Sequence, residues 1–333
     1  MNLNTVYSFA KTGNISNGNR NLRIGYPTGE QYFNGYFDEL MIYNRALNNN
    51  ELEFIYYDLL GNYSYLWSTG DTTTSITVSP EQSTTYTVEI SDGVNWCTDT
   101  VHVRVLHEIE VDMKVYLQGP YLGTGMIQFL NLFGFIPKEQ PYSGSPWNYS
   151  GIDTVSQIPN TDIIDWVLVE LRNSTDGLYG ATENMRASRK AAFMNKNGFI
   201  VDTSGNNYLK MLVEDTTLLY PMIYHRNHLP IFSSSEFILV NGVYTYDFTT
   251  GPEKVYGGAT TCTELSPGVW GMIGGNALPD NQIDNLDKNE AWLLEMGSNG
   301  YYNGDLNMNG TVENTDKQNI WAPNAGKGSK VPE

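Results

Sequence analysis

The chain has 333 residues, enough for two or three domains. Its 37 acidic and 19 basic residues give a net charge of −18, which argues against a nucleic-acid partner and against binding to an anionic membrane surface. No uninterrupted apolar run approaches the roughly 20 residues that span a bilayer, so we expect no transmembrane segment.

The composition predicts a mainly β protein of a secreted kind. Tyrosine is abundant (23 residues), and only 17% of the residues are charged. Cys97 and Cys262 fall in different predicted modules, so we expect no disulfide between them, and we expect Cys97 to be a small buried hydrophobe. The N-terminus (MNLNTVYSF) shows no export signal. If the protein is exported, we expect this chain to be a fragment.

Residues 1–60 end in a strand-like alternation followed by a short predicted helix. Asn48 and Glu51 have the spacing of a capping box, which opens that helix. The stretch GYFDELMIYNRALNNNE resembles the C-terminal end of a laminin-G-like, concanavalin-type jelly roll. The resemblance covers only about sixty residues and implies a partial lectin-like domain.

Residues 62–107 form the most regular β pattern. Thr, Val and Tyr alternate between turns at 69–71, 79–81 and 92–93. The phrases WSTGDT and TYTVEISDGVNWC resemble Ig-like or PKD-like repeats of bacterial surface proteins. That resemblance implies a spacer or stalk, here without its first strands.

Residues 108–270 predict a mostly antiparallel β-sandwich with one short helix, Glu183–Asn195. The predicted strands are Val111–Gln118, Trp166–Arg172, Gly198–Asp202, Leu209–Val213, Leu218–Tyr224 and Phe237–Phe248. Phrases such as LQGPY, DWVLVELR and YHRNHLPIFS resemble a C-terminal domain of large bacterial secreted proteins, as does the ending GKGSKVPE. The resemblance extends from about 111 to 333. It implies location and architecture, without an activity.

Two polar pairs in this module could suggest an active site. His225 and His228 lie in an apparent strand, where odd spacing would point them to opposite faces, so we interpret them as structural. Glu170 and Arg172 share a strand face and predict an ion pair. No catalytic motif is recognisable, and the protein is not predicted to be an enzyme.

The loop QPYSGSPWNYSG gathers three aromatic residues, Tyr142, Trp147 and Tyr149. They could stack on sugar rings, or they could pack against the sandwich. Packing is the favoured interpretation, and the sugar alternative stays open.

Residues 271–333 contain two twelve-residue stretches, 276–287 and 305–316, with oxygen side chains at positions 1, 5 and 12 and a hydrophobic residue at position 8. An EF-hand-like loop supplies oxygen ligands to Ca²⁺ from positions 1, 3, 5, 7, 9 and 12. The candidate ligands of the second loop are Asp305, Asn307, Asn309, Thr311, Glu313 and Asp316. Those of the first loop are Asn276, Asp280, Gln282, Asp284 and Asp287.

The pair of loops resembles a dockerin-type calcium segment, because position 12 is Asp in both. The first loop departs from the pattern: position 1 lacks a carboxylate, and Leu278 replaces a ligand. We therefore expect weak binding, roughly 10⁻⁴–10⁻³ M, with plain turns as the alternative, above all for the first loop. Trp292 and Trp321, which follow the loops, are expected to dock on the sandwich once Ca²⁺ is bound.

The sequence thus predicts mainly β, multidomain β-sandwiches with a C-terminal tandem calcium-loop segment. The predicted function is a non-enzymatic extracellular or cell-surface adhesion or scaffold protein of bacterial type, stabilised by Ca²⁺. The alternatives are a carbohydrate- or cohesin-binding accessory region of a larger secreted hydrolase or adhesin, or a self-assembling surface protein. Expected partners are glycans, a cohesin-like or surface protein, or further copies of the chain pairing through exposed strand edges.

Overall fold

The computed structural model describes residues 43, 45–49, 51, 52, 55, 63–93 and 95–332. The chain divides into two compact units, Met1–Ile76 with Thr87–Asp99 and Thr77–Tyr86 with Thr100–Glu333. Most of the predicted jelly-roll segment lies outside the described residues. Its capping box lies inside them and is confirmed, because Asn48 N donates to Glu51 Oε2 and Glu51 N donates to Asn48 Oδ1, both at 2.9 Å.

A three-stranded sheet in the order β1-β2-β3 follows. Its strands are β1 (Ser64–Trp67), β2 (Thr84–Ser91) and β3 (Trp96–Val103). Tyr86 and Val88 alternate on one face of β2 and are buried, as the Thr/Val/Tyr pattern predicts. Cys97 is exposed on β3, so the prediction of a buried Cys97 is wrong. Both Cys97 and Cys262 are free thiols.

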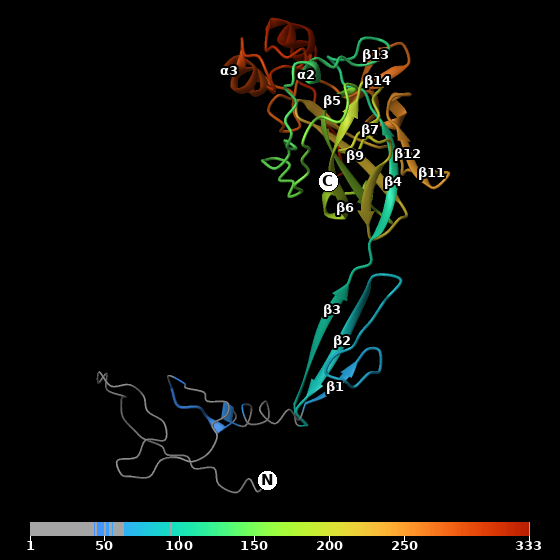
Figure 1. The fold of residues 1–333 in the computed structure, drawn as a ribbon, viewed down its shortest axis with the longest axis vertical. Coiled ribbons are helices and arrows are strands. Elements are labelled where there is room, and N and C mark those ends of the chain that lie inside the picture. The colour runs from blue at the N-terminus through green and yellow to red at the C-terminus, as the bar shows by residue number, and fades with distance from the viewer. Residues whose placement is uncertain are drawn as a thin grey trace, which may run out of the picture. The chain divides into compact units, whose positions relative to one another are not determined.

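Two further sheets form the larger β unit (Figure 1). One has the order β10-β9-β5-β6-β7 and the other β11-β12-β4-β8. Within these two sheets β4 and β12 run parallel, and the other neighbours are antiparallel. The first sheet comprises β5 (Ile163–Asn173), β6 (Arg186–Asn195), β7 (Ile200–Val201), β9 (Leu219–His225) and β10 (His228–Phe232). The second comprises β4 (His107–Lys114), β8 (Leu209–Val213), β11 (Ile238–Val240) and β12 (Val243–Asp247).

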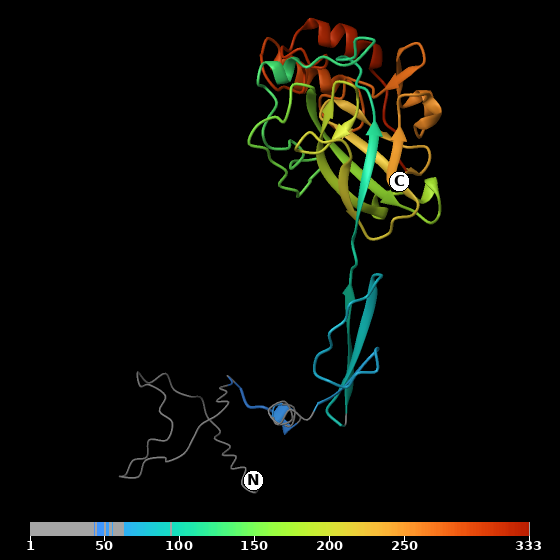
Figure 2. The ribbon, with the colours of Figure 1, turned by 45° about the vertical axis from the view of Figure 1, so that its right-hand side comes forward.

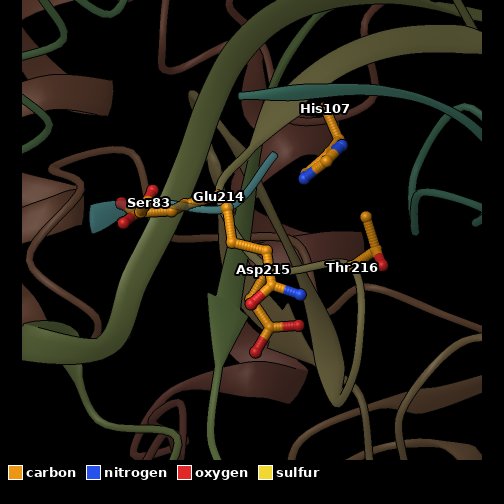
Figure 3. A pocket seen from close by; sticks show the side chains of 6 residues that line it. Ser83, His107, Glu214, Asp215 and Thr216 are labelled. Atoms are coloured by element: carbon orange, nitrogen blue, oxygen red, sulfur yellow. The ribbon is translucent and has the colours of Figure 1, made fainter. Parts of the chain in front are cut away.

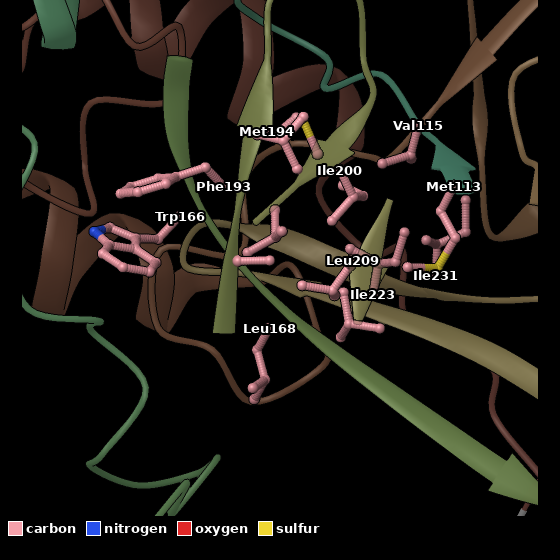
Figure 4. Close-up of a cluster of buried hydrophobic side chains, with 14 of the residues drawn as sticks. Met113, Val115, Trp166, Leu168, Phe193, Met194, Ile200, Leu209, Ile223 and Ile231 are labelled. Carbon is pink, nitrogen blue, oxygen red and sulfur yellow. The ribbon is translucent and has the colours of Figure 1, made fainter. Parts of the chain in front are cut away.

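One hydrophobic core joins the two sheets. Met113 of β4, Leu209 of β8, Phe193 of β6 and Ile223 of β9 are all buried in it (Figure 4). Strand β5 is central in its sheet, and ten of its eleven residues are buried, which explains its long apolar run. The predicted mainly β character is confirmed.

The predicted helix over Glu183–Asn195 is wrong. Residues Glu183–Met185 form one 3₁₀ turn (η2), and Arg186–Asn195 is strand β6, paired with β5 along nearly its whole length. The Ala, Arg and Met residues of this segment favour a helix. Tertiary pairing overrides that preference, because β6 completes the backbone hydrogen bonds of the buried strand β5.

The predicted strand Phe237–Phe248 is a hairpin. Asn241 and Gly242, with φ of 52° and 87°, form its two-residue turn between β11 and β12. Asn-Gly is the usual sequence of such a turn. Strand β11 lies at the edge of its sheet and begins at Ile238.

Short helical turns complete the unit. They are α2 (Phe129–Leu132), η1 (Leu178–Gly180), η3 (Pro252–Lys254) and η4 (Gly258–Thr260). A small hairpin of β13 (Thr263–Ser266) and β14 (Val269–Gly271) leads to the C-terminal segment. There the π-helical turns η5 (Asp287–Trp292) and η6 (Asp316–Trp321) continue into α3 (Leu293–Glu295) and α4 (Ala322–Asn324).

The C-terminal turns lie beside α2 at one end of the large unit in both views (Figures 1 and 2). In the described part of the chain, no helix has the length and apolar character needed to cross a bilayer.

Candidate metal centre

The two predicted calcium loops are halves of one structural repeat. Gly297 N donates to Val312 O at 2.8 Å, and Gly326 N donates to Ile283 O at 2.7 Å. Donors and acceptors are each 29 residues apart (326 − 297 and 312 − 283), the spacing between the two loops in the sequence. The first glycine after each helical segment, Gly297 or Gly326, therefore donates its N–H to the carbonyl at position 8 of the other loop.

The tryptophans that follow the two loops connect the two halves of the repeat by hydrogen bonds. Trp292 Nε1 donates to Glu313 O, and Trp321 Nε1 donates to Asp284 O, both at 2.9 Å. The acceptors are the position-9 carbonyls of the opposite loops. The indoles therefore bind the neighbouring repeat, whereas the sequence predicts docking on the sandwich. Trp321 also packs against the buried cluster formed by Leu229 of β10, Ile273 and Ile283.

Asp305 and Asp316, at positions 1 and 12 of the second loop, are fully buried. Asp305 accepts backbone N–H groups from Asn309 (3.0 Å) and Gly310 (2.8 Å). Asp316 accepts them from Asn307 (2.9 Å) and Glu313 (2.8 Å). Burial raises the pKa of Asp305 to about 7 and that of Asp316 to about 6. The two carboxyls also raise each other's cost of ionisation.

The remaining candidate ligands line the same loop. Asn309 Nδ2 donates to Glu313 Oε1 at 3.1 Å, and Gly310, at position 6, has a φ of +88° that permits the sharp turn. Asn307 Oδ1 accepts from Asn309 N at 2.9 Å, and Thr311 Oγ1 donates to Asn299 Oδ1 at 2.7 Å. Among the residues that the structure describes, no three Asp, Glu, His or Cys side chains converge enough to hold a metal. An ion here would depend on amide and backbone carbonyl oxygens as well as carboxylates.

The first loop has the same backbone with different chemistry at position 1. The hydrogen-bond partners of Asn276 turn its amide nitrogen toward the carbonyl oxygens of Leu278 and Gln282, each at 2.9 Å. The position-7 carbonyl, a metal ligand in an EF-hand-like loop, is therefore occupied by an N–H donor. Asn276 is buried, and its amide nitrogen bridges these two carbonyl oxygens.

The three aspartates of the first loop accept backbone N–H groups. Asp280 accepts from Gln282 N at 3.0 Å, and Asp284 accepts from Leu286 N at 2.6 Å. Asp287 accepts from Leu278 N and Asp284 N, and burial raises its pKa to about 6. Its carboxylates therefore have backbone partners, as Asp305 and Asp316 do in the second loop, and the two loops differ at position 1.

A tight hairpin of β9 and β10 contacts the second loop through its turn. His225 and His228 are paired residues of this hairpin, with Arg226 and Asn227 as its turn. Their Nδ1 atoms are 3.0 Å apart, so the prediction that the rings point to opposite faces is wrong. The rule of alternation fails because the chain reverses between them.

The hairpin turn binds the backbone that enters the second loop. Arg226 Nη1 donates to Tyr302 O, and Asn227 Nδ2 donates to Asp305 O at 2.9 Å and to Asn303 O at 3.2 Å. These contacts position Asp305 directly.

Asp165, at the start of β5, holds this turn in place. It accepts from Arg226 Nε (2.9 Å) and Tyr301 OH (2.6 Å), and His225 Nε2 lies 3.3 Å away. Burial opposes ionisation, yet Arg226 and His225 keep the pKa of Asp165 near 2. The Arg226 guanidinium lies 4.3 Å from the centroid of the Tyr301 ring. We call Asp165, His225, Arg226, His228 and Tyr301 the buried polar hub.

Sequence reasoning missed the hub as a unit. The available signal is the run HRNH between two apolar stretches, because consecutive polar residues in a buried hairpin require partners. Its partners Asp165 and Tyr301 are 60 and 76 residues from His225 (225 − 165 and 301 − 225), so no local pattern connects them.

The predicted ion pair on β5 is confirmed and is larger than expected. Arg172 Nε donates to Glu170 Oε1 at 2.8 Å, and Arg186 and Arg189 approach Glu170 Oε2 at 3.0 and 3.3 Å. In the nearby aromatic loop, Tyr142 is buried and its hydroxyl donates to Trp166 O at 2.8 Å, as packing requires.

A separate hollow of about 420 Å³ is lined by Ser83, His107, Glu214, Asp215 and Thr216, together with Gln82 (Figure 3). Glu214 is already paired with Arg104 at 2.8 Å. Hydrogen bonds from Ser83 and Arg104 lower the pKa of Glu214, which makes this carboxylate a weak base toward the Ser83 hydroxyl, so the second loop is the stronger candidate site.

Comparison with known proteins gives no assignment. No family model matches the chain, and no curated protein or solved structure matches it either.

Proposed function

We propose that the second loop binds one Ca²⁺ and that the first loop binds none. Asp305, Asn307, Asn309, Glu313 and Asp316 would supply side-chain oxygens, and Thr311 its backbone carbonyl. The bound ion would supply positive charge to the buried carboxyls of Asp305 and Asp316. The sequence alone predicts calcium ligands in both loops, whereas this proposal assigns Ca²⁺ to the second loop alone.

The observation that carries the proposal is the contrast between Asp305 and Asn276. Both occupy position 1 of their loops and both are buried. Asn276 bridges its loop with N–H bonds, whereas Asp305 places a negative charge beside the Asp316 carboxyl. A buried charge of this kind is costly unless a cation compensates it. Oxygen donors of this type suit a hard cation such as Ca²⁺.

Binding would stabilise the fold, because the loop is connected to the sandwich through the buried polar hub. Asn227 binds Asp305 O, and Arg226 binds both Tyr302 O and Asp165. A ligand that binds only the folded loop adds its binding free energy to folding. Calcium therefore acts as a structural clamp on residues 276–332 in this proposal.

For the protein as a whole we propose a non-enzymatic adhesion or scaffold role outside the cell. The nearest approach to catalytic chemistry in the described residues is the Asp165–His225 pair. His225 is 1% exposed and its Nδ1 atom faces His228, so no substrate can reach the pair. The net charge of −18 and the resemblance to secreted bacterial modules support an extracellular setting.

Self-assembly is the second candidate, supported by edge strand β11. Its residues Ile238, Leu239 and Val240 are 62%, 59% and 48% exposed. An exposed apolar edge strand offers unpaired backbone groups to another chain.

Thermal unfolding with Ca²⁺ titrated from chelator to about 10 mM tests the proposal, with Mg²⁺ as the control ion. If Kd is about 10⁻⁴ M, the ion adds about 2.7 kcal/mol, which raises Tm by roughly 5–10 °C. Asp305→Asn should abolish the rise, because it gives the second loop the position-1 residue of the first. Asp280→Asn, the matched control on an exposed carboxylate of the first loop, should leave the rise intact. An equal rise in Asp305→Asn would overturn the proposal.

A further inference from the structure

A hollow of about 360 Å³ lies over the five-stranded sheet, on the side away from the sheet that contains β4. Strands β5, β6 and β9 contribute Arg172, Arg189 and Tyr224, and the aromatic loop contributes Trp147. Asn281, at position 6 of the first loop, also lines it. This volume is at the lower end of the range for small-molecule sites.

The hollow is positively charged in a strongly acidic protein. Arg172, Arg186 and Arg189 surround it, and only Glu170 and Glu183 oppose them, which leaves an excess of one positive charge (3 − 2). Glu170 is completely buried, whereas Glu183 is 73% exposed on its side chain and pairs only with Arg186. The buried Glu170 carboxylate is therefore shared by the guanidinium groups of all three arginines.

Arg189 contributes a largely buried guanidinium to the hollow. Its side chain is 11% exposed, and its Nη1 donates to Trp147 O at 2.7 Å. Its Nε is buried and lies 3.3 Å from Glu170 Oε2 without hydrogen-bonding geometry, so this atom is not available to a ligand in the hollow. Burial lowers the pKa of the Arg189 guanidinium, because Glu170 does not fully compensate its charge. The guanidinium charge of Arg189, together with that of Arg186, favours an anionic group such as a carboxylate in the hollow.

The other walls offer aromatic and amide groups. Trp147 and Tyr224 are half-buried, and Asn148 is exposed at the rim. The Tyr142 ring meets Trp147 edge to face with centroids 5.0 Å apart, which fixes the indole. Aromatic surface beside amides suits a ring that is apolar on its faces and hydroxylated at its edge.

We propose that this hollow binds an acidic sugar, a hexuronate unit whose carboxylate pairs with Arg189 and Arg186 and whose ring lies against Trp147. The site is independent of the calcium loop, since no residue named in the second loop lines it.

Titration of the intact chain in saturating Ca²⁺ with glucuronate, followed by tryptophan fluorescence and calorimetry, tests this site. Glucose, which lacks the carboxylate, and inorganic sulfate are the comparison ligands. We expect glucuronate to bind in the millimolar range or tighter, with glucose and sulfate at least tenfold weaker. Arg186→Gln, at a half-exposed position, should weaken binding about tenfold, as expected for a lost charge-assisted hydrogen bond.

Arg189→Lys provides a second variant that keeps the charge and removes the planar fork, and it should also weaken glucuronate. Arg104→Gln, on the exposed Arg104–Glu214 pair outside this hollow, should change nothing. Equal binding of glucose, stronger binding of sulfate, or unchanged affinity in Arg186→Gln would each overturn the proposal. Absence of binding at about 50 mM glucuronate would also overturn it. The Ca²⁺-induced rise in Tm, measured on the same samples, separates this outcome from failure of the calcium proposal.

Discussion

Asp165→Asn is expected to destabilise the large β unit by about 3–5 kcal/mol, because it leaves the Arg226 guanidinium buried without its counter-charge. The carboxylate accepts from Arg226, Tyr301 and the backbone N–H of Trp166. An amide cannot accept all of these bonds, since one of its two terminal atoms is a donor. Urea unfolding monitored by tryptophan fluorescence measures the loss.

The chain offers a matched control for this prediction. Asp162 pairs with Lys196 at 2.9 Å, three residues before Asp165, but both side chains are largely exposed. Asp162→Asn should change the free energy of unfolding by less than about 1 kcal/mol. Equal effects of the two substitutions would refute the role assigned to the buried polar hub. The double variant Asp165→Asn with Arg226→Met should recover part of the loss, because it removes the uncompensated charge.

The second large effect is a pH dependence that Ca²⁺ removes. The pKa of Asp305 is raised from 3.8 to about 7 and that of Asp316 to about 6 when no cation is present. A raised folded-state pKa gives stability that is complete below pH 3.8 and is lost as pH rises through about 7. In chelator, therefore, stability of the C-terminal segment should fall as pH rises from about 4 to about 7, the interval between the unfolded-state and folded-state pKa values. For Asp305 alone the loss is at most on the order of 4 kcal/mol, at about 1.4 kcal/mol per pKa unit.

Other groups near the loop act in the opposite direction or stay constant. Burial lowers the pKa of His225 and that of His228, so these histidines stabilise the fold above pH 6.5 and destabilise it as pH falls. Arg226 stays charged throughout and lowers the pKa of Asp305. The difference between stability curves with Ca²⁺ and with chelator isolates the carboxylates. The rate of protease cleavage within 276–332, compared at pH 5 and pH 8, measures this loss of stability. A cleavage rate in chelator that does not increase with pH would contradict the prediction.

The two twelve-residue loops could be located from the sequence because their pattern is local. The positive φ of Gly310 and the burial of Asp305 and Asp316 agree with their positions in the twelve-residue pattern. The sequence also indicates that the first loop is deviant, through Asn276 and Leu278. It could not show that the Asn276 amide binds two carbonyl groups, because that depends on the folded backbone.

Strand β6 shows the limit of local preference. Its Ala, Arg and Met residues favour a helix, and only pairing with β5 makes the segment a strand. The same limit applies to His225 and His228, where an unrecognised two-residue turn reversed the expected side-chain directions. In contrast, Leu209–Val213 alternates between buried and exposed residues and was predicted with its observed bounds.

The arginine-lined hollow could not be predicted in full, because its parts are distant in sequence. The pairing of Glu170 with Arg172 follows from alternation along one strand. Arg186 and Arg189 come from the segment predicted to be a helix, so their approach to Glu170 was not foreseen. Asn281 reaches the same hollow only through the tertiary arrangement of the first loop.

Calcium stoichiometry of the intact chain, measured by titration calorimetry at pH 7.5, tests the central claim most directly. We expect one ion per chain, none in Asp305→Asn, and one in Asp280→Asn. Two ions in the unaltered chain, or an ion that persists in Asp305→Asn, would contradict the assignment of the second loop as the single calcium site.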